Sequence, residues 1–280
     1  MLWKTFGRFF HAMEDYLPHC GKRAGGRRAA TPLVGGAGFS LVELLTVMAA
    51  VGLLAALGAG GWSLAIGAAQ SAACRSNLRQ LATANLAYAA DHGRFVAAAS
   101  DIGGSNAIRW HGVRQGKAFD GAQGPLAPYL GGEGGSGWVR RCPAFHPEED
   151  GFEASCGGYG YNALGVGSEL CVADGDGFTV GLRPGALSHP SHIVMFADAA
   201  FLQGRGAKAR LIEYSFAEPP QFAGGGTPWP SIHFRHRGKA NVAWCDGRVT
   251  SEPLARRGGP ASPHLLGWFG PDDNRLFAPF

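Results

Sequence analysis

The first candidate for chemistry is a single carboxylate, Glu43, at the start of a long apolar segment. No charged residue occurs from Leu44 to Cys74, which exceeds the roughly 20 apolar residues that a helix needs to cross a bilayer. A carboxylate in hydrocarbon is costly and usually has a functional partner. A cut after Gly38 would give Phe39 a cationic α-amine, and the amine of a neighbouring copy could pair with Glu43. The pattern predicts a membrane-inserted chain whose copies associate.

The second candidate is His236, which is separated from Asp246-Gly247 by nine residues. A histidine paired with a carboxylate can act as a general base. No nucleophile in a strained elbow and no phosphate-binding glycine loop accompanies the pair. A structural role is therefore favoured, in which His236 bonds a strand end or Asp246 while Gly247 supplies a positive φ in a turn. We expect no enzymatic activity.

The cysteines allow both disulfides and a metal site. One of the six, Cys20, precedes the apolar segment, and five follow Glu43: Cys74, Cys142, Cys156, Cys171 and Cys245. An oxidising compartment would permit disulfides, and the short loop rich in glycine and acidic residues between Cys142 and Cys156 favours that pair. The alternative is a zinc site built from Cys142 and His146 with a later Cys or His. Zinc sites usually show paired spacing such as Cys-x-x-Cys, which is absent, so no metal is expected there.

A further acidic pair, Asp174 and Asp176, resembles a fragment of a calcium loop. Placed at the third and fifth positions of an EF-hand, these residues leave Val172 at the first position and Arg183 at the twelfth, so the spacing fails. A different calcium geometry that uses Asp198 or carbonyl oxygens stays open. A plain Asp-Gly turn is favoured, and we expect no cofactor.

A long helix must position Glu43. Beyond the apolar segment, mostly apolar residues recur at helical spacing at 74, 78, 81, 85 and 88, so the helix continues to His92-Gly93. About 53 residues at 1.5 Å each give about 80 Å, too long for one globular head to bury. The first half must lie in lipid or in a bundle of copies. Three interior glycines, each costing about 1 kcal/mol relative to alanine, predict a flexible joint, and such small residues also allow close helix contact in a membrane: Gly58, Gly60 and Gly61.

Beyond Gly93, short apolar runs bounded by glycine and proline predict strands and loops. Residues 191–198 indicate a buried strand, and residues 240–249 indicate a hairpin about the Asp-Gly turn. Three other segments complete the head: exposed loops at 204–210 and 218–230, and an apolar tail at 256–280 that is expected to dock.

The net positive charge of the chain comes from the residues that precede the apolar segment. Residues 1–38 carry six basic and two acidic side chains, a net charge of 6 − 2 = +4, which equals that of the whole chain. The remainder has 25 − 6 = 19 basic and 21 − 2 = 19 acidic residues, so charge gives no case for nucleic-acid binding. Basic residues before a span favour a cytoplasmic N-terminus, which puts the residues beyond about 70 outside, in a periplasm-like space.

The segment Gly38-Phe39-Ser40-Leu41-Val42-Glu43-Leu44-Leu45, followed by an apolar helix, resembles the processing site of type IV prepilins and type II secretion pseudopilins. In that family a membrane peptidase, the prepilin peptidase, cuts after the glycine and methylates the new N-terminus. The resemblance implies cleavage between Gly38 and Phe39, N-methylation of Phe39, and Glu43 as the assembly carboxylate.

A second, narrower resemblance lies at the other end of the chain. The spacing of His236 and Asp246-Gly247 resembles the C-terminal motif of a large set of pilin-like proteins named for this His-x9-Asp-Gly pattern. Other landmarks agree with that set: the Cys-x-x-Asn-Leu-Arg-Gln run at 74–80, Arg141-Cys142-Pro143, Tyr159-Gly160-Tyr161-Asn162, and Pro190-Ser191 leading into 194–198.

The expected fold class is α+β and pilin-like, with a long transmembrane N-terminal helix packed on a C-terminal antiparallel β-sheet head. The predicted parts are a basic leader at 1–38, the helix at 39–92 and the head at 93–280. The expected function is that of a structural subunit which prepilin peptidase processes in the inner membrane. Its N-terminus would be cytoplasmic and its head periplasmic, and it would join other copies or related subunits in a periplasmic or surface fibre. The alternative is a single-span anchored protein that never polymerises and whose head binds a ligand or acts as an envelope enzyme.

Overall fold

The structure is a computed structural model, and it divides into two units, residues 1–53 and 54–280. The residues that it describes are 38–116, 118–131, 139–168, 180–221, 226, 228–257 and 264–278. We use "head" for the described residues that follow the long helix.

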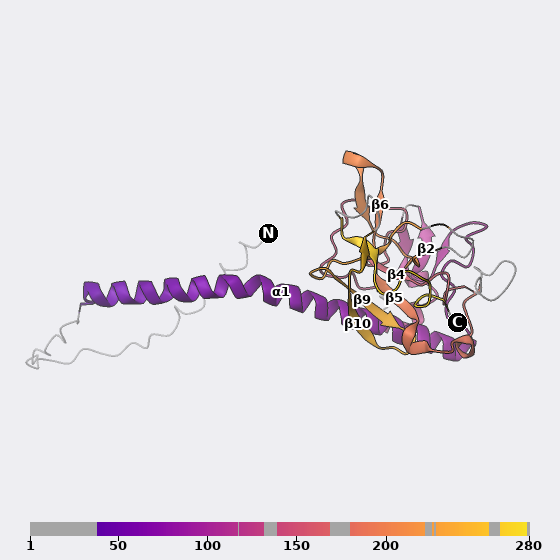
Figure 1. Ribbon diagram of the computed structural model, residues 1–280, viewed down its shortest axis with the longest axis horizontal. Helices are drawn as coiled ribbons and strands as arrows, with labels where there is room; N and C mark the ends of the chain where they lie inside the picture. Colours follow the sequence, from indigo (N-terminus) through magenta and orange to yellow (C-terminus); the bar gives the residue numbers. More distant parts are fainter. Residues whose placement is uncertain are drawn as a thin grey trace, which may run out of the picture. The chain divides into compact units, whose positions relative to one another are not determined.

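Helix α1 is an uninterrupted α-helix of 52 residues, Leu41–His92, which Figure 1 shows as the longest element. It starts two residues later than predicted and ends where predicted. Gly93 has a φ of +72°, and its N–H bonds the carbonyl of Ala89, which is a common way for a helix to end. The helix continues through Gly58 without a break, so the flexible joint stays a prediction.

The central sheet of the head has four strands in the order β10-β9-β5-β4, and every neighbouring pair is antiparallel. Strand β9 pairs with β10 from Val249↔Ala243 to Pro253↔Lys239, and a bulge interrupts the β5–β9 pairing between Val194 and Phe196. The strand bounds are β4 Tyr159–Tyr161, β5 Val194–Asp198, β9 Lys239–Trp244 and β10 Val249–Pro253.

Smaller antiparallel sheets and short 3-10 turns surround the central sheet. One sheet contains β1 Ile108–Arg109, β2 Gly112–Gln115 and β3 Ala118–Asp120. A second contains β11 Arg256–Arg257, β12 Leu266–Trp268 and β8 Ile232–His233. The third is a hairpin of β6 Phe201–Gln203 and β7 Arg210–Ile212. The 3-10 turns are η2 Gly121–Gln123, η3 Ala127–Tyr129, η5 Pro184–Ala186, η6 Pro190–His192 and η7 Gly206–Lys208.

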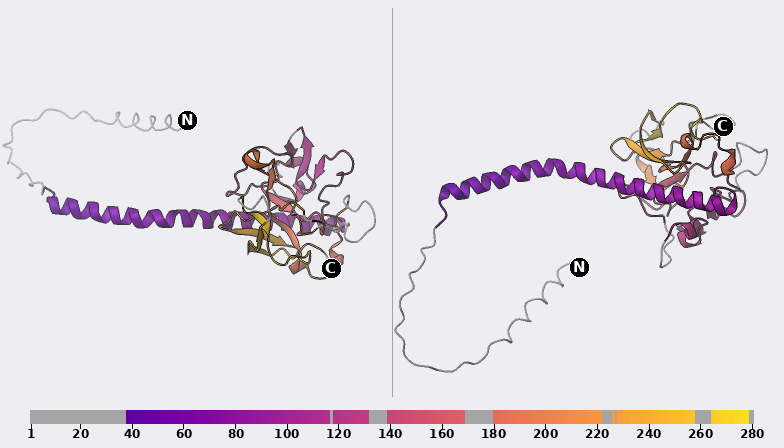
Figure 2. Two further views of the ribbon diagram at one scale, coloured as in Figure 1. Left: turned by 45° about the horizontal axis from the view of Figure 1, so that its top comes forward. Right: turned by 90° about the horizontal axis from the view of Figure 1, so that it is seen from below.

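The central sheet is covered on both faces. Leu78 and Leu81 of α1 belong to the same buried cluster as Phe196 and Ala243 of the sheet, and the last part of α1 runs beside the sheet in both views of Figure 2. Alternate residues of β9 face a second cluster formed with the C-terminal segment, whose members include Val242, Trp244, Phe234, Trp268, Phe269 and Phe277. This alternation is what a strand with period 2 gives when both faces are buried.

The long helix and the antiparallel sheets confirm the α+β fold class. Residues 194–198 form a fully buried strand, and the predicted hairpin forms as β9 and β10. Residues 204–209 form a mostly exposed connection between β6 and β7, and the docked tail is confirmed by buried Trp268 and Phe277.

The expectation that residues 218–230 form an exposed loop holds only in part, since Gln221, Gly226 and Trp229 are exposed but other described residues are buried. Among the described residues of this loop, four prolines are buried: Pro219, Pro220, Pro228 and Pro230. Their rings are apolar and pack into the head, and Gln221 exchanges hydrogen bonds with Asn274 of the C-terminal segment. Proline marked this segment correctly as a loop, because it cannot donate to a sheet, but the prolines themselves are buried.

Candidate functional site

Glu43 forms part of a helix cap. Its carboxylate accepts a hydrogen bond from the Ser40 N–H (2.9 Å), and its own N–H donates to Ser40 Oγ (3.2 Å). This reciprocal pair is a capping box, in which Ser and a Glu three residues later satisfy two N–H groups at the start of a helix. The spacing Ser-x-x-Glu was a signal for this role in the sequence. Glu43 therefore has a local structural function in addition to any role as a partner for an amine.

The first half of α1 is rich in exposed, large apolar side chains. Large apolar side chains between Phe39 and Ile66 are exposed, among them Leu45, Leu54 and Trp62. Helix α1 is long and apolar enough to cross a membrane, and its most apolar stretch has no buried residue. An exposed apolar surface of this size marks a membrane or protein contact.

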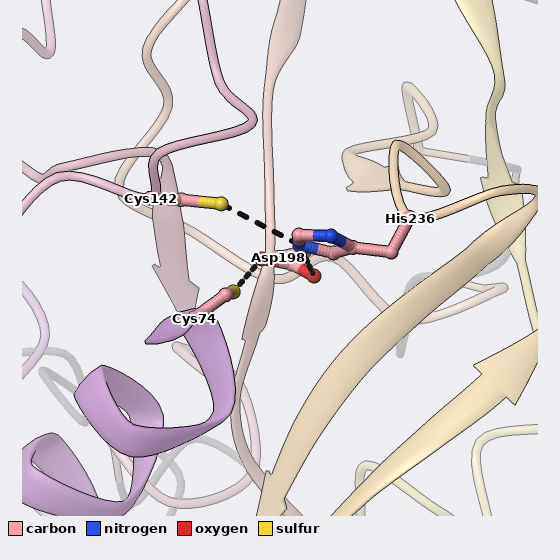
Figure 3. A group of neighbouring side chains, drawn as sticks. All are labelled: Cys74, Cys142, Asp198 and His236. Atoms are coloured by element: carbon pink, nitrogen blue, oxygen red, sulfur yellow. Dashed lines mark hydrogen bonds and ion pairs between the residues drawn. The ribbon is translucent and has the colours of Figure 1, made fainter. Parts of the chain in front are cut away.

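Four buried side chains with metal-binding atoms meet inside the head: Cys74, Cys142, Asp198 and His236. They come from α1, from the segment before Pro143, from the end of β5, and from the turn between β8 and β9, and Figure 3 shows them pointing toward one another. Their donor atoms all lie within 4.8 Å of one another. They form the candidate metal centre of the described part of the chain.

Short contacts connect the four donors. The His236 Nε2 lies 3.4 Å from the Cys142 sulfur and 3.3 Å from Asp198 Oδ2. The Cys74 thiol donates to Asp198 Oδ1 at 2.9 Å. Arg235 Nη2 donates to the same Oδ1 at 2.9 Å, and the Asn241 N–H donates to Oδ2 at 2.7 Å. Each carboxylate oxygen thus contacts two neighbouring groups.

The charges of the cluster are strongly perturbed. Burial by itself raises the pKa of Asp198, but the Arg235 cation and the bond to His236 lower it to about 2. Burial lowers the pKa of His236, whereas its bonds to Asp198 and Cys142 raise it to about 9. The neighbouring Cys74 and the contact with His236 lower the pKa of Cys142 to about 5 against the opposing effect of burial. Burial raises the pKa of the Cys74 thiol well above its usual range.

A cysteine, a histidine and an aspartate close together can form a nucleophilic triad, but this geometry differs from one. In a triad the two nitrogens of the imidazole face the nucleophile and the carboxylate separately. Here the same atom, Nε2, faces both Cys142 and Asp198. Cys142 lines an open hollow of about 540 Å³, but its side chain is buried.

The structure separates the two ends of the predicted His236 and Asp246-Gly247 motif. His236 lies in the turn before β9 and Asp246 in the turn after it, and the side chain of His236 contacts Asp198 at a strand end. The Asp246 carboxylate instead accepts from the Arg248 N–H at 2.9 Å. Gly247 has a φ of +85°, as predicted for this turn. The motif therefore fixes both ends of one central strand.

The predicted disulfide between Cys142 and Cys156 is not formed, since both are free cysteines. The Cys142 sulfur faces His236, whereas the backbone N–H of Cys156 bonds the Glu213 carboxylate. His146, the other residue of the zinc alternative, is exposed and is not in the cluster. The calcium candidates Asp174 and Asp176 lie outside the described residues, as does Cys171.

The sequence did not indicate that Cys74, Asp198 and the neighbouring Arg235 lie together with Cys142 and His236 in one site. Cys74 was assigned to the apolar face of the helix and Asp198 to the end of a buried strand, both correctly. An acidic residue at the end of a wholly apolar strand was the available signal, because a buried carboxylate needs a partner. Comparisons with known proteins add no assignment, since no family model, curated protein or solved structure matches the chain.

Proposed function

We propose that this chain is a structural, pilin-like subunit that prepilin peptidase processes at the inner membrane and that assembles with other copies or related subunits into a periplasmic or surface fibre. The head would lie on the periplasmic side before assembly. The observation that carries the proposal is the run of exposed large apolar side chains from Phe39, just before α1, to Ile66 within it, with Ser40 and Glu43 at its start.

That surface needs a partner. Burial of apolar area stabilises by about 25 cal/mol per Å², so an exposed run of large apolar side chains favours lipid or other helices over water. In lipid the helix satisfies its own backbone hydrogen bonds. When a subunit leaves the bilayer, the same surface can be buried only against other helices, which supports assembly into a bundle.

The proposed processing route is tested by intact mass and N-terminal sequencing of protein recovered from a host with an active prepilin peptidase. We expect a mature chain that begins at Phe39 and carries one added methyl group. A host that lacks the peptidase should give the uncut chain. An uncut N-terminus in the active host would contradict the processing route and favour the anchored, non-polymerising alternative.

The role of the Glu43 charge is tested with three variants. Glu43→Gln keeps a side chain that can serve in a capping box but removes the charge, whereas Ser40→Ala removes the serine's part of the cap and keeps the charge. Glu43→Ala removes both the charge and the hydrogen bond that the glutamate side chain contributes to the cap. If an amine pairs with the carboxylate, Glu43→Gln and Glu43→Ala should both be depleted from sheared filament fractions. Ser40→Ala should be incorporated into filaments like the wild-type protein.

Fibre incorporation of Glu43→Gln at the wild-type level would show that charge is not needed. Equal loss in Ser40→Ala and Glu43→Ala would assign the effect to the cap. In both cases immunoblots of the membrane fraction must show equal amounts of each variant, so that a folding defect is not taken for an assembly defect.

A further inference from the structure

We propose that Cys74, Cys142, Asp198 and His236 bind a Zn²⁺ ion that fastens helix α1 to the head. The proposal goes beyond the fibre function and does not depend on it, because the same centre would form in an anchored protein that never polymerises. Three of the four side chains belong to the head and one to the helix, so the ion would join two parts of the chain that are far apart in sequence.

The donor spacing fits a tetrahedral ion. With zinc–ligand distances of about 2.0–2.3 Å, neighbouring donor atoms of a tetrahedron lie about 3.3–3.8 Å apart. His236 Nε2 lies 3.3 Å from Asp198 Oδ2 and 3.4 Å from the Cys142 sulfur. The Cys74 sulfur lies 2.9 Å from the other carboxylate oxygen, Oδ1, and one ligand atom from each of the four residues lies within 4.8 Å of the other three. His236 Nε2 faces both the Cys142 sulfur and Asp198 Oδ2. Ligand atoms that surround one shared ion are expected to face one another in this way.

The chemistry of the donors selects the metal. Two sulfurs, one imidazole nitrogen and one carboxylate oxygen form a set that Zn²⁺ accepts, whereas Mg²⁺ and Ca²⁺ take oxygen ligands. All four donors come from buried residues. Four protein ligands close a tetrahedral site and leave no position for water or substrate, which is typical of structural rather than catalytic zinc.

The charges balance when the ion is included. A metal deprotonates the thiols that bind it, so Cys74, Cys142 and Asp198 would contribute three negative charges. Buried Arg235, which bonds Asp198, contributes one positive charge, and Zn²⁺ contributes two, which brings the sum to zero. A neutral buried group avoids the cost of an unpaired charge, and the Arg235 bond would hold the carboxylate in its binding orientation.

The competing arrangement is a disulfide between Cys74 and Cys142, which an oxidising compartment would permit. It would use two of the four residues. A disulfide gives no reason for His236 Nε2 to face both Cys142 and Asp198. If it forms, peptide mapping without reductant will detect it.

The test uses full-length protein purified from membranes in mild detergent, without chelators, from cells grown with added zinc. Elemental analysis should give an equimolar amount of zinc. A strong chelator should remove the ion and lower the midpoint of thermal unfolding, and added Zn²⁺ should restore it. Co²⁺ loaded in place of zinc should give thiolate-to-cobalt charge-transfer bands and the intense visible bands of a tetrahedral site.

Two variants and one control locate the ion. Cys142→Ser and His236→Ala should lose zinc to the level of a mock purification. Cys245→Ala removes another buried cysteine that lies outside the cluster and should keep zinc at the wild-type level. If the ligand variants fail to fold, the cobalt spectrum of the wild-type protein still decides the question.

Three results would overturn the proposal. The first is wild-type protein that contains no zinc and shows no cobalt–thiolate bands after loading. The second is a Cys74–Cys142 disulfide in peptides mapped without reductant. The third is a zinc loss in Cys245→Ala as large as that in Cys142→Ser.

Discussion

Replacing Glu153 with glutamine is expected to lower the free energy of unfolding of the head by about 3–5 kcal/mol, because it removes the counter-charge of a buried arginine. Arg109 is only 2% exposed, and its guanidinium bonds both oxygens of Glu153, with Nη2 at 2.9 Å from Oε1. Ser215 Oγ donates to Oε2 at 2.6 Å, and Arg114 lies 3.7 Å from Oε1. Glutamine keeps the size of the side chain but leaves two cations facing a neutral amide.

The matched control is Asp273→Asn, which makes the same acid-to-amide change at an exposed pair with Arg275. Water and salt screen such a pair, so no measurable change is expected. Thermal unfolding of full-length protein in detergent, followed by near-UV circular dichroism, measures both. At about 2–4 °C per kcal/mol for a domain of this size, Glu153→Gln should unfold about 6–20 °C earlier. A midpoint equal to that of Asp273→Asn would contradict the argument.

Local patterns predicted the elements of this fold well. The apolar residues of α1 beyond its first, most apolar part, such as Cys74, Leu78 and Leu81, are buried as their helical spacing indicated. The β9–β10 hairpin follows from its Asp-Gly turn, because a positive φ at Gly247 reverses the chain within a few residues. Such features depend on residues close in sequence, and period and turn chemistry report them directly.

The candidate metal centre depends on contacts that no local pattern reports. Its four side chains come from four separate segments, and their convergence is set by how α1, β5 and the β8–β9 turn pack. Zinc was disfavoured because paired Cys-x-x-Cys spacing is absent, but that spacing belongs to sites built on short local loops. A site assembled by tertiary packing needs no such spacing. The disulfide prediction for Cys142 and Cys156 failed for the same reason, since closeness in sequence did not bring the sulfurs together.

The landmark Tyr159-Gly160-Tyr161-Asn162 also makes contacts with distant segments that no local sequence pattern reports. The hydroxyl of Tyr161 accepts from Asn85 of α1 and donates to the Val96 carbonyl, which connects the sheet to the helix. The Asn162 amide donates to the carbonyls of Val194 and Phe277 at 2.8 and 2.9 Å, which connects it to the C-terminal segment. The landmark identified residues that hold layers together, although the sequence alone did not identify their partners.

Gly165→Ala is expected to destabilise the head by about 2–5 kcal/mol, because a Cβ at this position would lie 1.6 Å from the Phe277 carbonyl oxygen and 2.9 Å from Asn162 Nδ2. The backbone at Phe277 must move, and the buried Asn162 amide then loses an acceptor. Gly185→Ala is the control, since no atom lies within 4 Å of its Cβ, and it should be neutral or stabilise by about 0.4–1 kcal/mol. Thermal unfolding gives the free-energy difference, and limited proteolysis should release the C-terminal segment of Gly165→Ala first. Equal unfolding midpoints for the two variants would show that the C-terminal segment does not depend on this close approach.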